Sequence, residues 1–312
     1  MLLVTGASGL LGASVLQSAV DLGWQAVGLC HRHVLRNPKM PVAQVDLTDS
    51  SATRKLLHDL RPTAIIHCAA ATNVDWCEDN PTRAQAINVQ ASALLAQSAT
   101  ELNSAFIYIS TDAIFDGASG RYVETDQPAP LNIYAKSKLA GEQESMRLHP
   151  AALVVRVNIY GWNAQEKQSL AEWVLVRLQA GNDVPGFADV FFTPILVNHL
   201  VPILFAMLQH KLTGIYHVAG SERVSKFEFA QRVATTFGFD PAQITPCHVK
   251  DMKLIAPRPL DISLNTAKVT RALGLSLPGI DSGLRKFREL RDQQYPQQLK
   301  NYLLNNNDHS ND

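Results

Sequence analysis

Cysteine is scarce in this chain of 312 residues, and no two cysteines form a C-x-x-C pair. The four are Cys30, Cys68, Cys77 and Cys247. A chain of this length does not need disulfide staples to fold, so we expect reduced, buried thiols. A metal-ligating cluster is also missing. His31 and His33 lie close together, but no third ligand stands nearby, so we expect surface histidines and no metal site.

Neither sign of charge is in excess, because 28 Lys and Arg residues balance 28 Asp and Glu residues. The sequence therefore gives no indication of a basic surface for nucleic acid or for an anionic membrane. No apolar run approaches the ~20 residues that a membrane span needs. Residues 1–5 are too few and too uncharged to form a signal peptide. We expect a globular protein in the cytoplasm, with neither nucleic acid nor membrane as a partner.

The first half of the chain alternates short apolar runs with segments of helical apolar spacing. Strands are expected at residues 2–5, 25–30, 42–45, 64–68, 105–110 and 153–157, and helices at 10–22, 50–60, 81–100 and 133–148. Ser50 or Ser51 is the expected cap of the second helix, and Asn80 caps the third, with Pro81 at its first position. This alternation predicts an α/β fold, a Rossmann-type doubly wound parallel sheet with helices on both faces.

The pattern loosens after residue 157. Helices are expected at 166–180, 197–209, 226–237, 268–273 and 282–293, a strand at 214–218, and a loop or short strand at 186–194. Residues 240–261 are weakly patterned. We therefore expect a dinucleotide-binding domain at 1–157, to which 189–219 returns, and a smaller C-terminal α+β substrate lobe at 158–188 and 220–304. The polar tail 305–312 is expected to be disordered.

A glycine triplet, Gly6, Gly9 and Gly12, lies directly between the first expected strand and the first expected helix. Only glycine lets the backbone turn this tightly and approach a pyrophosphate, which the N–H groups of the following helix then bind. We expect a dinucleotide here, with a mere tight turn as the alternative. The other loop residues expected to contact it are Ser8, Leu10 and Leu11.

The end of the second strand indicates which dinucleotide is preferred. An acid there would bind the ribose 2′-hydroxyl of NAD, but the strand ends in Cys30-His31-Arg32-His33. Arg32 favours the 2′-phosphate of NADP, so we expect NADP(H) with NAD(H) possible; a solvated basic turn is the alternative. Asp46 and Leu47 are expected beside the adenine, with a packing role as the alternative. Small residues after the fourth strand fit either cofactor contact or packing: Ala69, Ala70 and Ala71.

Tyr134 and Lys138 stand four residues apart on an expected helix and therefore share one face. An ammonium beside a phenol lowers the phenol pKa, so Tyr134 is expected to act as a general acid or base. Thr111 ends the fifth strand, where its hydroxyl would either steer a substrate carbonyl or cap the strand. Asn88, inside a helix, is expected to organise a water or a backbone turn near the lysine, or to make a plain buried polar contact.

These segments resemble the extended short-chain dehydrogenase/reductase family over nearly the whole chain. The matches are T-G-x-x-G-x-x-G at residues 5–12, the alanines at 69–71, Asn88, Ser110-Thr111-Asp112 and Y-x-x-x-K at residues 134–138. Within the family, the chain looks most like the dTDP-4-dehydrorhamnose reductase branch, through residues 72–78, 109–117, 192–194 and 258–259.

The resemblance implies NAD(P)H-dependent reduction of a 4-keto-6-deoxy sugar nucleotide. By this analogy Tyr134 is the proton donor, Lys138 tunes it and holds the nicotinamide ribose, and Asn88 belongs to the cofactor site. Thr111 positions the keto oxygen with Asp112 beside it. The implied substrate contacts are Val74, Asp75 and Arg258. Arg258 would meet the nucleotide diphosphate, or would instead form a salt bridge at a helix start.

One position departs from the resemblance, and two other functions stay open. Ala113 stands where the reductases usually carry an aromatic residue and where a dehydratase would carry Glu, which argues against dehydratase chemistry. The alternatives are a nucleotide-sugar epimerase on the same scaffold and a non-catalytic regulatory subunit resembling the β-subunit of methionine adenosyltransferase. Family resemblance implies a monomer or a homodimer.

Overall fold

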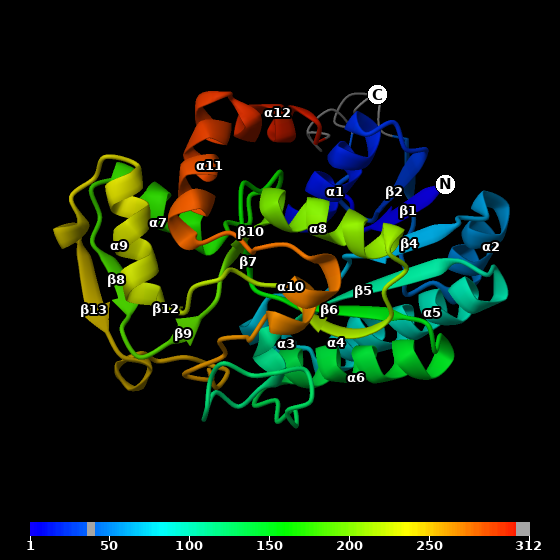
Figure 1. The fold of residues 1–312 in the computed structure, drawn as a ribbon, viewed down its shortest axis with the longest axis horizontal. Helices are drawn as coiled ribbons and strands as arrows, with labels where there is room; N and C mark the ends of the chain where they lie inside the picture. The colour runs from blue at the N-terminus through cyan, green and yellow to red at the C-terminus, as the bar shows by residue number, and fades with distance from the viewer. Residues whose placement is uncertain (36–40, 304–312) are drawn as a thin grey trace, which may run out of the picture.

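A seven-stranded parallel sheet forms the centre of the protein, which we describe from a computed structural model covering residues 1–35 and 41–303 (Figure 1). The predicted tail lies outside these residues. The strand order is β11-β6-β5-β4-β1-β2-β3. The strands are β1 (Leu2–Thr5), β2 (Ala26–Cys30), β3 (Val42–Gln44), β4 (Ala64–His67), β5 (Ala105–Thr111), β6 (Leu153–Val157) and β11 (Gly214–His217). The predicted doubly wound sheet is confirmed.

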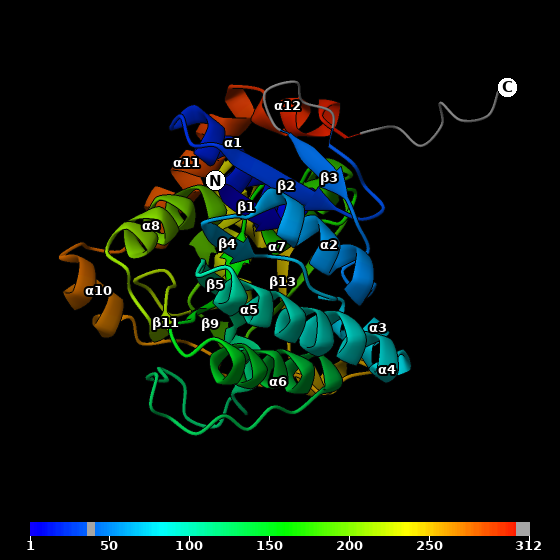
Figure 2. The same cartoon turned by 90° about the vertical axis from the view of Figure 1, so that its right-hand side faces the viewer.

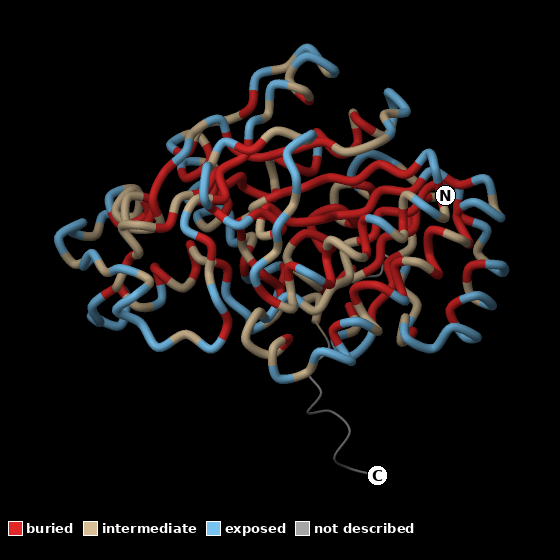
Figure 3. The backbone as a smooth tube through the Cα atoms, turned by 90° about the horizontal axis from the view of Figure 1, so that it is seen from below, coloured by how far each residue is buried: buried red, intermediate tan, exposed pale blue. Residues whose placement is uncertain are grey.

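Helices cover both faces of this sheet, as Figures 1 and 2 show. On one face α1 (Leu10–Asp21) packs beside α8 (Val197–Gln209). On the other lie α2 (Ser50–Leu60), α5 (Ala91–Glu101) and α6 (Ile133–Leu148). The central strands β1, β4, β6 and, after its first residue, β5 are buried from both sides, visible as the red band in Figure 3, because alternate side chains feed two separate apolar clusters.

A second lobe is built from the later part of the chain around its own aromatic core. Its helices α7 (Leu170–Gln179), α9 (Lys226–Thr236) and α11 (Ile280–Asp292) pack around Phe229 and Phe287. Three strand pairs accompany them: β7 (Ile159–Tyr160) with β10 (Ile195–Leu196), β8 (Val184–Phe187) with β13 (Ile244–Cys247), and β9 (Phe191–Phe192) with β12 (Val224–Ser225). Strand β11 leaves this part of the chain to join the edge of the main sheet, beside β6.

Some helix boundaries differ from the predicted ones because side chains cap the backbone elsewhere. Helix α2 is capped by Asp49, whose carboxylate accepts the Ala52 N–H, and not by a serine. The helix predicted to start at residue 166 starts at Leu170, after Ser169, which forms a capping box with Glu172. Short helices that the periodicity did not predict are α3 (Val74–Asp79) and α12 (Tyr295–Asn301).

The long helix predicted at 81–100 is interrupted near its start. Pro81 begins α4 (Pro81–Gln85) as expected, but a π-helical turn, η1 (Ala86–Gln90), separates α4 from α5. Asn80 stands at the N-cap position of α4, as predicted, but its side chain makes no capping hydrogen bond; its Nδ2 donates to the Trp76 carbonyl at 3.0 Å. The π-turn inserts one extra residue per turn and contains Asn88, so it sets where that side chain points.

The remaining elements complete the lobe and the edge of the sheet. They are η2 (Asp112–Ile114), η3 (Pro241–Gln243), η4 (Val249–Asp251) and α10 (Ala267–Leu273). Segment 240–261, weakly patterned in the sequence, therefore holds two short helical turns around β13. Among the described helices, none combines the length and the apolar character required to cross a membrane.

Candidate active site

A cleft of about 930 Å³ opens at the carboxyl ends of β1, β4, β5 and β6. The strand order reverses between β1 and β4, so the chains leaving these two strands diverge and leave room between them. Predicted site residues that line the cleft are Gly6, Ser8, Gly9, Leu10, Leu11, Gly12, Arg32, Asp46, Leu47, Ala69, Ala70, Ala71, Thr111, Asp112, Tyr134 and Lys138. Asn88, Val74, Asp75 and Arg258 do not line it.

The glycine loop has the tight geometry that its sequence predicts. Gly6 adopts φ 63°, and its carbonyl accepts the Gly9 N–H at 2.9 Å. A Cβ on Gly12 would stand 2.1 Å from the Gly6 carbonyl oxygen, so no other residue fits there. Helix α1 follows with no side-chain cap and no acid in its first turn. Its free N–H groups and positive dipole end fit the pyrophosphate of a dinucleotide.

Basic side chains lie at the β2 and β3 end of the cleft. Arg32 is exposed there, and His31 Nε2 lies 3.4 Å from Asp46 Oδ2. Hydrogen bonds from Thr48 lower the pKa of the Asp46 carboxyl, and nearby cations lower it further. Burial raises this pKa, but by less, so the net effect is a lowered pKa. Arg83 of α4 also lines the cleft, a residue that sequence reasoning missed. Its place follows only from the packing of α4, so no local signal marks it.

Asn88 supports the cleft wall from behind. It is fully buried, its Oδ1 accepts the Ala71 N–H at 2.8 Å, and its Nδ2 lies 3.1 Å from the Ala71 carbonyl and 2.9 Å from Ser137 Oγ. It thereby ties the chain leaving β4 to α6. Asn88 itself is not among the residues that line the cleft, so its expected contact with the cofactor stays a prediction. The alternative of organising a backbone turn holds.

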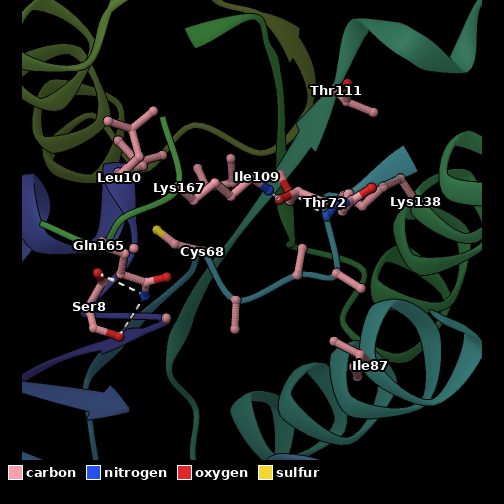
Figure 4. Close-up of a pocket in the computed structure, with 18 of the residues that line it drawn as sticks. Ser8, Leu10, Cys68, Thr72, Ile87, Ile109, Thr111, Lys138, Gln165 and Lys167 are labelled. Atoms are coloured by element: carbon pink, nitrogen blue, oxygen red, sulfur yellow. Dashed lines mark hydrogen bonds between the residues drawn. The ribbon is translucent and has the colours of Figure 1, made fainter. Parts of the chain in front are cut away.

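Tyr134 and Lys138 occupy successive turns of α6, which Asn132 caps by accepting the Ala135 N–H at 2.9 Å. Lys138 is only 3% exposed, and its ammonium donates to the Ile109 carbonyl at 2.8 Å. Figure 4 shows Lys138 and Thr111 among the residues that line the cleft. The tyrosine, the lysine and the end of β5 therefore meet at one edge of the cleft.

Burial moves both pKa values toward the neutral forms. Burial raises the pKa of Tyr134 to about 12, although the neighbouring Thr111 hydroxyl lowers it. Burial lowers the pKa of Lys138 to about 7, while the Glu142 carboxylate raises it. The prediction that the lysine lowers the phenol pKa is wrong here. The ammonium is directed at the Ile109 carbonyl, and desolvation of the phenolate is the larger effect.

Asp112 is buried beside Thr111 at the start of η2, with 2% of its surface exposed. Asn158 Nδ2 donates to Asp112 Oδ2 at 2.6 Å, and Thr111 Oγ1 donates to Oδ1 at 3.2 Å. Burial raises the pKa of Asp112 to about 7; these hydrogen bonds and the charge of Lys226 act in the opposite direction. Sequence reasoning missed Asn158, although a polar residue just after an apolar strand was a usable signal.

A buried ion pair lies behind the lysine. Glu142 and Arg156 are 2% and 3% exposed, and Arg156 Nη2 donates to Glu142 Oε2 at 2.8 Å. Ser110 also donates to Glu142, and His217 Nε2 lies 3.3 Å from Arg156 Nη1. This network links α6 to β5, β6 and β11 under the site. Arg156, a charged residue inside the apolar run 153–157, is the sequence signal for this network. The sequence does not indicate that its partner is Glu142.

Two residues implied as substrate contacts meet each other instead of lining the cleft. Arg258 Nη2 donates to Asp75 Oδ1 at 2.9 Å, and Asp75 stands in the first turn of α3, next to Val74. The alternative expectation, a salt bridge at a helix start, therefore describes Arg258. Its Nη1 is buried without a hydrogen-bond partner in the described structure. Within residues 1–35 and 41–303, no group of three His, Cys, Asp or Glu side chains stands ready to hold a metal.

Comparison with known proteins gives a consistent result. The profile of the RmlD substrate binding domain matches residues 1–291. A probable low-salt glycan biosynthesis reductase, Agl14 of Haloferax volcanii, is 34% identical over 287 residues, which cover 90% of this chain and 95% of that protein. The rat methionine adenosyltransferase 2 subunit beta is 34% identical over 297 residues, covering 91% of this chain and 87% of that protein.

Solved structures with a similar fold include dTDP-4-dehydrorhamnose reductases. A hypothetical dTDP-4-dehydrorhamnose reductase from Sulfolobus tokodaii superposes with a TM-score of 0.79 at 30% identity, covering 89% of this chain and 96% of that one. The dTDP-4-dehydrorhamnose reductase from Bacillus anthracis, solved in complex with NADP, has a TM-score of 0.80 at 27% identity and covers 92% and 98%.

Proposed function

Because the chain belongs to the RmlD substrate-binding-domain family of extended short-chain dehydrogenases/reductases, we propose that it reduces a 4-keto-6-deoxy sugar nucleotide. The observation that carries this proposal is the meeting of Thr111, Tyr134 and Lys138 at one edge of a cleft whose opposite edge is a glycine loop. The first group suits proton transfer to a carbonyl, and the loop suits a dinucleotide.

The residues of the cleft fit a nicotinamide dinucleotide, which when bound would supply a hydride to the carbonyl carbon. The NADP complex of the Bacillus anthracis relative supports this choice. We propose a preference for NADP(H), because Arg32 and Arg83 line the cleft near Asp46, where the adenosine end would lie. Lys138 would hold the nicotinamide ribose, as the family resemblance implies.

The chain's own residues would complete the reduction by delivering one proton. With its pKa raised to about 12, Tyr134 holds its proton at neutral pH and can give it to the keto oxygen as the C–O bond becomes an alcohol. The Thr111 hydroxyl would orient that oxygen. Asp112, fixed by Asn158, stands beside Thr111 and would contact the sugar.

A specific observation favours a second candidate, a dinucleotide-binding regulatory subunit. The rat methionine adenosyltransferase 2 subunit beta is as similar to this chain as the glycan reductase is, at 34% identity. A subunit of this kind would bind NADPH but consume none with any sugar nucleotide. It would instead retain a partner enzyme from its own cell extract.

The test is to offer the protein dTDP-4-keto-6-deoxyglucose and its epimerised form, each with NADPH and with NADH, and to identify the product by NMR. We expect consumption of the reduced cofactor and a 6-deoxy sugar nucleotide with a hydroxyl at C4. Cofactor binding without consumption for either sugar would contradict the rhamnose-type assignment and favour the regulatory candidate.

We propose two further properties. Family resemblance supports a monomer or a homodimer, which light scattering distinguishes. All four cysteines are free thiols, which suits a reducing compartment such as the cytoplasm.

A further inference from the structure

The loop at 161–169, which joins β7 to α7, reaches across the cleft from one wall to the other (Figure 4). Gln165 Nε2 donates to the Ser8 carbonyl at 3.1 Å and lies 3.2 Å from Ser8 Oγ, in the glycine loop. Two residues further on, the Lys167 ammonium donates to the Thr72 hydroxyl, just beyond the alanines after β4. The loop thus touches both sides of the place where β1 and β4 diverge.

Internal hydrogen bonds hold this loop in shape. Asn163 Nδ2 donates to the Lys167 carbonyl at 2.6 Å, and Asn163 Oδ1 accepts the Gln165 N–H at 3.1 Å. The Asn163 N–H donates to Glu172 of α7, and Ser169 Oγ donates to the Gly161 carbonyl at 2.7 Å. Both ends are therefore fixed, and Gln165 and Lys167 are presented over the cleft by a preformed turn.

Lys167 is placed to add a charge that the glycine loop does not have. Arg32 and Arg83 stand near Asp46 at the adenosine end, and Lys138 donates inward to the Ile109 carbonyl. In the part of the chain that the structure describes, no acidic side chain forms an ion pair with Lys167, whose hydrogen-bond partner is a neutral hydroxyl. A dianionic pyrophosphate lying on the N-terminus of α1 would meet this ammonium from the opposite side.

We propose that Lys167 binds the pyrophosphate of the dinucleotide and that Gln165 holds the 161–169 loop over it. The inference rests on the proposed function only in taking a dinucleotide as the ligand. Lys167 supplies the cation, and Gln165 ties the loop to Ser8 of the glycine loop. Because the pyrophosphate is common to both cofactors, the effect of Lys167 does not depend on the 2′-phosphate, whereas that of Arg32 does.

The test measures affinity and dissociation rate for NADPH, NADH and ADP-ribose by fluorescence and calorimetry, with no sugar substrate present. Lys167→Gln should weaken all three by a similar factor, about tenfold or more, as expected for loss of a charge-assisted hydrogen bond. Gln165→Ala should speed dissociation of all three. Lys167→Arg should restore most of the affinity. Lys136→Gln, which removes an exposed lysine of α6 outside the cleft, should change none.

Each outcome separates this inference from the proposed function. Wild-type affinities for NADPH, NADH and ADP-ribose in Lys167→Gln, with the fold intact by thermal melting, would overturn the role of the loop and leave the reductase assignment untouched. A loss confined to NADPH would also overturn it, because the lysine would then contact the 2′-phosphate. Equal loss of all three ligands, in a protein that reduces no sugar, would support the loop and contradict the reductase.

Discussion

Burial sets the protonation states of the residues around the reacting end of the cleft. It raises the pKa of Tyr134 to about 12 and that of Asp112 to about 7, and it lowers the pKa of Lys138 to about 7. All three groups thus move toward the neutral form, as desolvation requires. For Tyr134 this is the form that donates a proton, so the site is suited to the reducing direction.

Asp112 should make stability depend on pH. The folded protein keeps this carboxyl protonated up to about pH 7, whereas the unfolded chain releases the proton near pH ~4. The unfolding free energy should therefore fall as pH rises through this window. Asp112→Asn has no proton to lose, so its advantage over wild type should grow from near zero at pH ~4 to on the order of 4 kcal/mol at pH ~8, since each pKa unit is worth about 1.4 kcal/mol.

Thermal melting across this pH range measures the effect, with the exposed Asp59→Asn as the control. A difference between Asp112→Asn and wild type that stays constant with pH would show that Asp112 does not titrate as described.

The Glu142–Arg156 pair should be far more costly to break than a surface pair. Glu142→Gln leaves the buried guanidinium without its counter-charge, which should reduce the unfolding free energy by about 3–5 kcal/mol. Glu144→Gln is the matched control, because Glu144 Oε2 lies 2.7 Å from Nη2 of the exposed Arg147, close to the 2.8 Å of the buried pair. It should cost about 0–1 kcal/mol. Equal losses in denaturant titrations of the two variants would contradict the structural role.

At the scale of elements, the sequence predicts most of what faces the ligand. The glycine loop, the strand ends and the start of α6 are local patterns of residue type and spacing, and the structure places them around one cleft. The π-turn at Ala86–Gln90 and the cap at Asp49 are not local in this sense. A π-turn follows from packing against α6, and Asp49, Ser50 and Ser51 are equally good caps by residue type.

Two glycines of the same turn should respond very differently to an added methyl group. Gly12→Ala puts a Cβ 2.1 Å from the Gly6 carbonyl, a backbone atom that cannot move without opening the turn. In Gly9→Ala the Cβ stands 3.3 Å from the same oxygen, which a small shift accommodates. We expect Gly12→Ala to weaken NADPH binding by more than about tenfold, over 1.4 kcal/mol, and Gly9→Ala to weaken it less.

Fluorescence titration with NADPH, alongside a melting curve for each variant, measures this difference. Equal affinities for the two folded variants would mean that the close approach of Gly12 to Gly6 does not shape the binding site.

At the scale of the whole molecule, the parallel sheet is predictable and the meeting of distant segments is not. Alternating strands and helices dictate the doubly wound core, and β11 extends it beside β6. By contrast, Arg258 pairs with Asp75 from 183 positions away, and Gln165 reaches Ser8 from 157 away. No periodicity encodes such contacts, because they depend on how the second lobe sits against the sheet.

The central claim is that this fold brings a proton donor to a dinucleotide and a carbonyl substrate. The most direct measurement follows the absorbance of NADPH with the keto-sugar nucleotide for wild type and Tyr134→Phe, after showing that both bind NADPH equally. We predict that wild type oxidises NADPH and that the variant is slower by about 10²–10⁴-fold, the contribution of a general acid. Equal rates for the two proteins would contradict the assignment of Tyr134 and, with it, this account of the site.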